Sequence, residues 1–167
     1  MSPHRSAAAL TPGSVLVATE KSHDPDFADS VVVLIQSNAE SAVGLVLNKP
    51  TKIPISDLLP EAKGRRIVVY AGGPVTIGVR GLVRTKSVPY FRVVTNRSEL
   101  LRLIARGAPP SEFRIYAGYV GWTASQLENE VQRGLWKVEP ADGSRIFVKA
   151  AQSRADSAIP PNPSMPI

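Results

Sequence analysis

Short apolar runs rich in β-branched residues, separated by turn-forming residues, most constrain how this chain can fold. Residues 31–35, Val-Val-Val-Leu-Ile, are apolar at consecutive positions, which is typical of a strand covered on both faces. A polar connection at 37–41 leads to a second run at 43–48, and the two runs predict a hairpin. Further strands are predicted at residues 15–19, 67–70, 81–84, 91–94, 113–117, 136–139 and 146–148. Because strands follow one another instead of alternating strictly with helices, we expect a single α+β domain with a mostly antiparallel or mixed sheet and a few short helices.

Two helices are predicted by the residues that begin and end them. Asn96 can cap the first, with Glu99 three positions later for a box-like exchange, and Gly107 ends it. Thr123 and Gln126 match the capping box of the second helix. In that motif the Thr hydroxyl accepts a hydrogen bond from the Gln126 amide while the Gln side chain reaches back.

The stretch 118–130, Gly-Tyr-Val-Gly-Trp-Thr-Ala-Ser-Gln-Leu-Glu-Asn-Glu, contains that second cap. Gly118 and Gly121 are expected to bracket the turn between the preceding strand and the helix. The free amides at the helix start could also hold an anion. Capping is the favoured interpretation, because Thr123 and Gln126 already satisfy some of those amides.

The length of 167 residues is most simply that of one domain. Residues 13–150 are expected to form it, between a flexible N-terminus at 1–12 and a flexible, Pro-rich tail at 151–167. No apolar run approaches the roughly 20 residues that span a bilayer, so we expect no membrane association. The sequence has no cysteine, which excludes disulfides and thiolate metal sites and fits a cytoplasmic protein.

Positive charge is concentrated in the middle of the chain. The net charge is +6, and residues 63–114 contain eleven Lys and Arg but only Glu99 and Glu112 as acids. Such asymmetry predicts an anionic partner, nucleic acid being the first candidate, whereas the alternative is an arginine-rich solvated surface. Few aromatic residues accompany these cations, and the helix ending at Gly107 is followed by a strand and not by a second helix. Nucleic acid is thus supported by charge and not by a motif.

Two other clusters were considered as ligand sites. His23, Asp24, Asp26 and Asp29 lack the spacing of a calcium loop, and a turn-forming, solvated role is favoured over metal binding. The Gly72-Gly73-Pro74 run follows a strand as a phosphate loop does, but it lacks the Gly-Lys-Ser/Thr ending and a tight turn is favoured. The sequence therefore predicts neither a metal nor a cofactor.

Four stretches taken together resemble a known family. They are Asp24-Pro-Asp-Phe-Ala-Asp-Ser-Val31, Val43-Gly-Leu-Val-Leu-Asn-Lys-Pro50, Ala71-Gly-Gly-Pro-Val75 and the stretch 118–130. In this order and spacing they resemble the bacterial YqgE/AlgH family. The resemblance implies a compact α+β fold in a bacterial, cytoplasmic protein. It implies no particular reaction, and the name AlgH reflects a proposed role in transcriptional control of alginate production.

These observations favour a non-enzymatic regulatory or binding protein, with a protein partner or an anionic ligand that the sequence does not identify. Its functional surface is expected where Asp24, Asn48, Gly72, Gly73 and Trp122 gather at one end of the sheet. One alternative is nucleic-acid binding through phosphate contacts by the basic segment 63–114. Another is an undiscovered hydrolase or transferase with Asp24 or Glu130 as acid or base.

Overall fold

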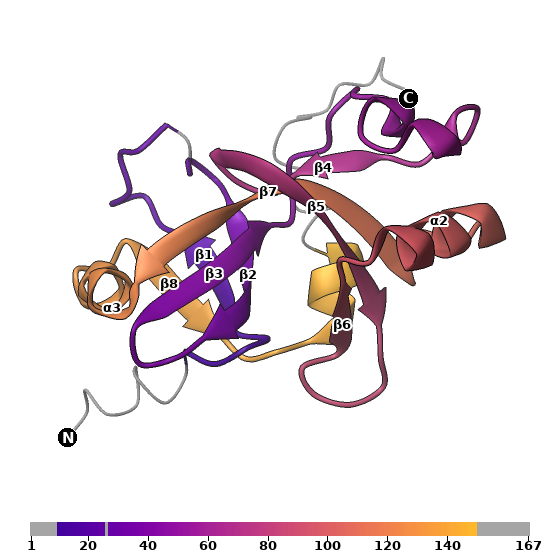
Figure 1. Cartoon of the computed structure of the whole chain (residues 1–167). Coiled ribbons are helices and arrows are strands. Elements are labelled where there is room, and N and C mark those ends of the chain that lie inside the picture. The colour runs from indigo at the N-terminus through magenta and orange to yellow at the C-terminus, as the bar shows by residue number, and fades with distance from the viewer. Residues whose placement is uncertain (1–9, 26, 150–167) are drawn as a thin grey trace, which may run out of the picture.

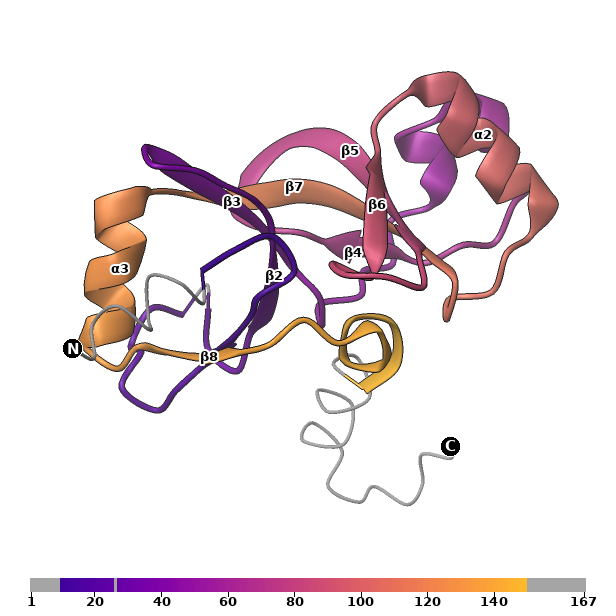
Figure 2. The same ribbon diagram turned by 90° about the horizontal axis from the view of Figure 1, so that it is seen from below.

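The computed structural model describes residues 10–25 and 27–149, so the flexible ends predicted from the sequence lie outside the described residues apart from 10–12. The elements, in chain order, are β1 (Val15–Ala18), β2 (Val31–Ser37), β3 (Ser41–Val46), η1 (Ile55–Asp57), η2 (Pro60–Ala62), β4 (Val69–Ala71), β5 (Val75–Arg84), β6 (Phe91–Val94), α2 (Arg97–Arg106), β7 (Phe113–Thr123), α3 (Ala124–Gln132), β8 (Trp136–Glu139) and η3 (Arg145–Lys149). Figure 1 and Figure 2 show α2 and α3 at opposite ends of the molecule, with β7 running between them.

The eight strands of the described residues form one sheet in the order β6-β5-β7-β3-β2-β1-β8, with β4 also beside β7. Every pair is antiparallel except β4 with β7, which is parallel. The predicted α+β fold and the predicted β2–β3 hairpin are therefore confirmed.

Three groups of buried apolar residues hold the sheet and helices together. The inner core includes Val15 of β1 and Phe91 of β6, which are distant in the strand order, so the sheet curves around this core. The α2 core lies between the sheet and α2, and the α3 core lies between the sheet and α3. In β2, Val33 faces the inner core while its neighbour Val32 faces the α3 core, so the inner core and the helix-covered cores occupy opposite faces.

The alternation of side chains along β7 changes at Gly118. Before Gly118, Ile115 faces the α2 core and Tyr116 faces the inner core; after it, Tyr119 faces the inner core and Trp122 the α3 core. One residue is thus inserted into the alternation, and Gly118 has the φ of +83° that a glycine bulge residue adopts. The register between β5 and β7 also shifts at this place.

This bulge corrects the prediction that Gly118 and Gly121 bracket a turn. β7 does not end there, because it continues to Thr123 in antiparallel register with residues 41–44 of β3. Glycine marks a bend within the strand, and only the following helix start ends it.

A second correction concerns residues 146–148, which were predicted to be a strand. They lie in η3, a short helical turn whose start is capped by Asp142. The Asp142 Oδ1 accepts hydrogen bonds from the amides of Ser144 at 3.0 Å and Arg145 at 3.3 Å. This local capping turns the chain before a strand can form, and Phe147 is buried in the inner core.

At both predicted helix starts, the hydrogen bond from a backbone amide to the capping side chain is confirmed. The Asn96 side chain accepts from the Glu99 amide at 2.9 Å, and Thr123 Oγ1 accepts from the Gln126 amide at 3.1 Å. Glu99 does not complete a capping box, because its carboxylate instead pairs with Arg92 of β6 at 2.8 Å. Within residues 10–25 and 27–149, no helix is long and apolar enough to cross a bilayer.

Candidate functional site

The glycines of the Ala71–Val75 stretch lie where the chain crosses over β7, from β4 on one side to β5 on the other. A Cβ on Gly73 would lie 2.3 Å from the carbonyl carbon of Tyr119, and one on Gly72 would lie 2.4 Å from the carbonyl oxygen of Gly118. A Cβ on Gly118 would lie 2.6 Å from the carbonyl oxygen of Val75. Because no side chain fits at such distances from the main chain, close backbone packing accounts for these three glycines.

Asn48 fixes the loop that precedes β2. Its side chain is 1% exposed; Oδ1 accepts from the Val31 amide at 3.0 Å, and Nδ2 donates to the Asp29 carbonyl at 2.9 Å. Asp24 lies exposed in the same loop, where its carbonyl accepts from the Phe27 amide at 3.0 Å. Asp26, a further candidate metal ligand, lies outside the described residues, and the described part of the chain contains no group of three or more His, Cys, Asp or Glu that could hold a metal.

Trp122 belongs to a clamp that attaches α3 to the sheet. The indole nitrogens of Trp122 and Trp136 both donate to Oε1 of Glu130, at 3.1 and 2.9 Å. The two rings meet edge to face with centroids 6.1 Å apart, and Trp122 is buried in the α3 core. The Glu130 carboxylate therefore joins α3 to β7 and β8.

The structure brings three of the five predicted site residues together. The Val46 amide donates to the Gly72 carbonyl at 2.8 Å, and the Ala71 amide donates to the Lys49 carbonyl at 2.8 Å, so Asn48 lies beside the Gly72–Gly73 crossing. Trp122 lies apart from them in the α3 core. The loop of Asp24 connects the two places, since Asn48 binds one part of it and its Phe27 ring packs on Trp136. A shared binding role for these five residues stays a prediction.

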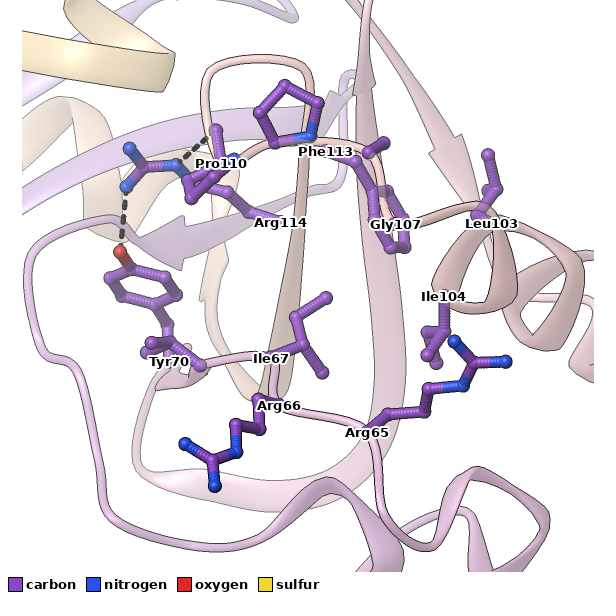
Figure 3. A pocket seen from close by; sticks show the side chains of 13 residues that line it. Arg65, Arg66, Ile67, Tyr70, Leu103, Ile104, Gly107, Pro110, Phe113 and Arg114 are labelled. Atoms are coloured by element: carbon purple, nitrogen blue, oxygen red, sulfur yellow. Dashed lines mark hydrogen bonds between the residues drawn. The ribbon is translucent and has the colours of Figure 1, made fainter.

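A cavity of about 410 Å³ lies elsewhere, between the connection into β4, the C-terminal turn of α2 and the connection into β7. Figure 3 shows Arg65 beside Ile104 and Arg114 beside Tyr70, with Ile67 between them. Arg65, Arg66, Ile67, Val68, Tyr70, Leu103, Ile104, Gly107, Ala108, Pro109, Pro110, Phe113 and Arg114 line the cavity. The lining thus combines a largely apolar wall with three guanidinium groups and has no Asp or Glu.

Arg114 is the unusual member of this lining, because it is a charged residue that is only 6% exposed. Its Nε donates to the Pro110 carbonyl at 2.9 Å, and one terminal nitrogen donates to the Tyr70 hydroxyl at 3.0 Å. The other terminal nitrogen donates to the carbonyl of Phe147 in η3. All these acceptors are neutral, and Arg114 forms no ion pair with a carboxylate of the described residues. Within the part of the chain that the structure describes, its charge is therefore buried without a counter-charge, a state that an anion in the cavity would relieve.

Tyr116 lies next to this arginine in β7 and is completely buried. Its ring packs against that of Tyr70 with centroids 5.5 Å apart, and its hydroxyl has no hydrogen-bond partner in the described structure. Burial raises the pKa of Tyr116 well above its ordinary value, while the charge of Arg114 acts in the opposite direction. The phenol is therefore neutral at physiological pH, and it does not neutralise Arg114.

Sequence reasoning missed this cavity as a site, although it identified the basic segment that contains its lining. The cavity residues all fall within 65–114 and belong to no recognisable motif. Two of the basic residues of that segment are taken up by ion pairs, Arg92 with Glu99 and Arg97 with Glu61. The sequence did show an excess of arginine in this segment. It did not show that Arg114 is buried.

Comparison with known proteins agrees with the geometry of the whole fold. The structure is similar to the solution structure of the AlgH protein from Pseudomonas aeruginosa, with a TM-score of 0.70 and 27% identity over 90% of this chain and 89% of that one. It is also similar to the crystal structure of protein DIP2367 from Corynebacterium diphtheriae, with a TM-score of 0.63 and 26% identity over 83% of this chain and 80% of that one.

Sequence comparison gives the same result. The chain is 32% identical over 157 residues to a UPF0301 protein of Hahella chejuensis, covering 86% of this chain and 84% of the relative. It is 37% identical over 155 residues to a UPF0301 protein of Methylococcus capsulatus, covering 83% and 84%. A family model described as AlgH-like matches residues 15–159. This chain therefore belongs to the AlgH-like family.

Proposed function

We propose that this protein is a non-enzymatic regulatory or binding protein of the bacterial cytoplasm, and that it binds an anionic ligand in the cavity between α2 and β4. The observation that carries the proposal is Arg114, which lines the cavity, is 6% exposed and, among residues 10–25 and 27–149, donates only to neutral acceptors. Burying a cation without a counter-charge costs free energy, and cavities that combine apolar surface with a few polar groups are typical of binding sites.

The surroundings of Arg114 support the same function. Arg65 and Arg66 are exposed beside the cavity, where they would attract an anion towards its mouth. Neither Asp24 nor Glu130 lines the cavity, so the carboxylates considered for acid or base chemistry are absent from its wall. A regulatory role is supported by membership of the AlgH-like family, and the cysteine-free sequence is compatible with the cytoplasm.

Native mass spectrometry can test the proposal. The purified protein would be incubated with small molecules extracted from bacteria, and any retained molecule would be identified after denaturation. We expect the wild type to retain an anion and Arg65→Glu to retain much less, because the substitution reverses an exposed charge beside the cavity. Arg133→Glu is the matched control, since Arg133 is exposed just beyond α3 at the other end of the molecule. Equal retention by Arg65→Glu and wild type would contradict the proposal.

The basic segment also supports a second candidate function, binding of nucleic acid through phosphate contacts. Arg102 and Arg106 of α2 line a second groove that shares Leu103 with the first cavity and also contains the Arg92–Glu99 ion pair. Its two other arginines add positive charge next to the first cavity. Such binding would weaken steeply with salt, because each neutralised phosphate releases a counterion. Gel shifts at low ionic strength test it, and the absence of any shift with single- or double-stranded nucleic acid would reject it.

A further inference from the structure

The lining of the cavity also indicates the chemical class of the ligand, on the basis of the proposed anion-binding function. We infer that the cavity takes a monocarboxylic acid with an apolar body, with its carboxylate on Arg114 and its body against Ile67, Ile104 and Phe113. The juxtaposition in Figure 3 carries this inference: the buried Arg114 guanidinium lies at one end of the cavity, apart from Arg65 and Arg66, and Ile67, Ile104 and Phe113 supply apolar surface.

The Arg114 guanidinium has N–H donors that its hydrogen bonds within the described structure do not use. A guanidinium has five N–H donors, and the three hydrogen bonds of Arg114 use Nε–H and one N–H of each terminal nitrogen. No acceptor among the described residues takes the remaining N–H of each terminal nitrogen. Two N–H groups of one guanidinium match the two oxygens of a carboxylate.

The backbone from Gly107 to Phe113 offers few free amides to an anion beside Arg114. Pro109 and Pro110 have no amide hydrogen, and the amides of Gly107 and Phe113 already donate to main-chain carbonyls. The other side-chain donors of the lining are the Tyr70 hydroxyl and the exposed guanidinium groups of Arg65 and Arg66. A carboxylate needs only the two remaining N–H groups of Arg114, whereas a phosphate has more oxygens to pair and would also need donors such as Arg65 and Arg66.

The apolar side chains of the cavity restrict the rest of the ligand. Ile67, Val68, Leu103, Ile104 and Phe113 offer hydrocarbon and ring surface and no hydrogen-bonding side-chain atoms. Sugars, nucleotides and peptides would bury polar groups here without partners, which costs free energy. An alkyl or aryl body has no such groups and gains from leaving water. The volume of about 410 Å³ falls in the range of small-molecule pockets, so a medium-sized acid fits.

Binding of straight-chain monocarboxylates from four to ten carbons, measured by titration calorimetry, tests the inference. Primary alcohols of the same lengths, alkyl phosphates and inorganic phosphate serve as comparison probes. We expect affinity for the acids to rise about fourfold per added methylene until the cavity is full, the fold-change that corresponds to about 0.8 kcal/mol per buried CH₂. Alcohols and inorganic phosphate are expected to bind at least tenfold more weakly.

A pair of matched variants locates the site. Val68 lines the cavity and is 46% exposed, so Val68→Glu should fold while placing a carboxylate near the bound acid; we expect affinity to fall at least tenfold. Ile77→Glu changes a residue that is 72% exposed on β5 and does not line the cavity, and it should leave affinity unchanged.

The outcomes separate the two proposals. If alkyl phosphates or inorganic phosphate bind as well as the acids and Val68→Glu weakens them, the anion site stands and the carboxylic-acid class is overturned. If alcohols bind as tightly as acids, the role of Arg114 in holding the head group is overturned. If none of these anions binds, while the purified protein still retains another anion that Arg65→Glu loses, only the ligand class is wrong; failure of both experiments removes the proposed function as well.

Discussion

The Gly72–Gly73 crossing and the arginine-lined cavity differ in two ways. The crossing is recognisable as a motif in the sequence and the cavity is not, and the cavity has more groups that could bind a ligand. At the crossing, glycines stand where a Cβ would collide with the main chain, and the Asn48 side chain beside them bonds the Val31 amide and the Asp29 carbonyl. In the cavity, ordinary arginine and aliphatic residues surround a buried charge that pairs with no carboxylate of the described chain. Residues of a recognisable motif can therefore have purely structural roles. A site that can still bind a ligand is formed here by residues that belong to no recognisable motif.

The strongest way to break this comparison is to substitute Gly73. We expect Gly73→Ala to destabilise the protein by about 4 kcal/mol or more, because its Cβ would lie 2.3 Å from the main chain of Tyr119 and neither can move without disturbing β7. Urea unfolding followed by circular dichroism measures this, if the variant folds at all.

Gly121→Ala is the matched control from the family stretch 118–130. A Cβ at Gly121 would meet its nearest atom at an ordinary 3.6 Å, so the change should stay within about 0.5 kcal/mol. Equal effects of the two substitutions would show that close packing does not explain the glycines.

Arg114 tests the cavity half of the comparison. Arg114→Ala should cost about 3 kcal/mol, because it leaves the Tyr70 hydroxyl and the carbonyls of Pro110 and Phe147 without their donor in a buried place. Arg65→Ala should change the free energy of unfolding by less than about 0.5 kcal/mol, since Arg65 is exposed. Thermal or chemical unfolding compares them, and a ligand effect from Arg65→Ala without loss of stability would separate binding from folding.

Tyr116 sharpens the comparison at alkaline pH. Because burial raises its pKa in the folded state, the folded phenol stays neutral where the unfolded one ionises, above its ordinary value of 10.0. Stability due to this group is complete below pH 10 and is lost as the pH rises, by up to about 1.4 kcal/mol per pH unit. Tyr116→Phe should flatten this alkaline loss and cost little at neutral pH, since the hydroxyl has no hydrogen-bond partner in the described structure. An unchanged pH profile of unfolding would contradict the buried, unpaired phenol.

The helix caps should give the smallest effect. Thr123→Ala removes the acceptor for the Gln126 amide and should cost about 1 kcal/mol, whereas Thr123→Ser should restore most of it. Asn96→Ala should behave similarly at α2. If Thr123→Ala abolished ligand binding without changing stability, the helix start would be part of the site and not only a cap.

Much of this fold could be predicted because several of its elements depend on residues that are close in the sequence. The apolar runs at 31–35 and 43–48 identified β2, β3 and their hairpin, and Asn96 and Thr123 identified both helix starts. The continuation of β7 through Gly118 was missed because it depends on pairing with β3, which is distant in sequence. Residues 146–148 were assigned to a strand because their apolar pattern did not reveal the Asp142 cap.

The candidate site was beyond sequence reasoning for a related reason. Its lining comes from two stretches that are distant in sequence, 65–70 and 103–114, and the decisive property is the burial of Arg114, which only tertiary packing determines. Charge composition alone pointed to the segment 63–114 and could not distinguish Arg114 from Arg92 or Arg97, which pair with carboxylates.

The contrast between the two regions can be tested in one titration, by following backbone amide NMR signals as decanoate is added to the ¹⁵N-labelled full-length protein. The predicted result is that the largest shifts cluster at residues 65–70 and 103–114, with little change at Gly72, Gly73 and residues 118–123. Saturable shifts centred on those glycines and the α3 helix start, with the signals around Arg114 unmoved, would contradict it.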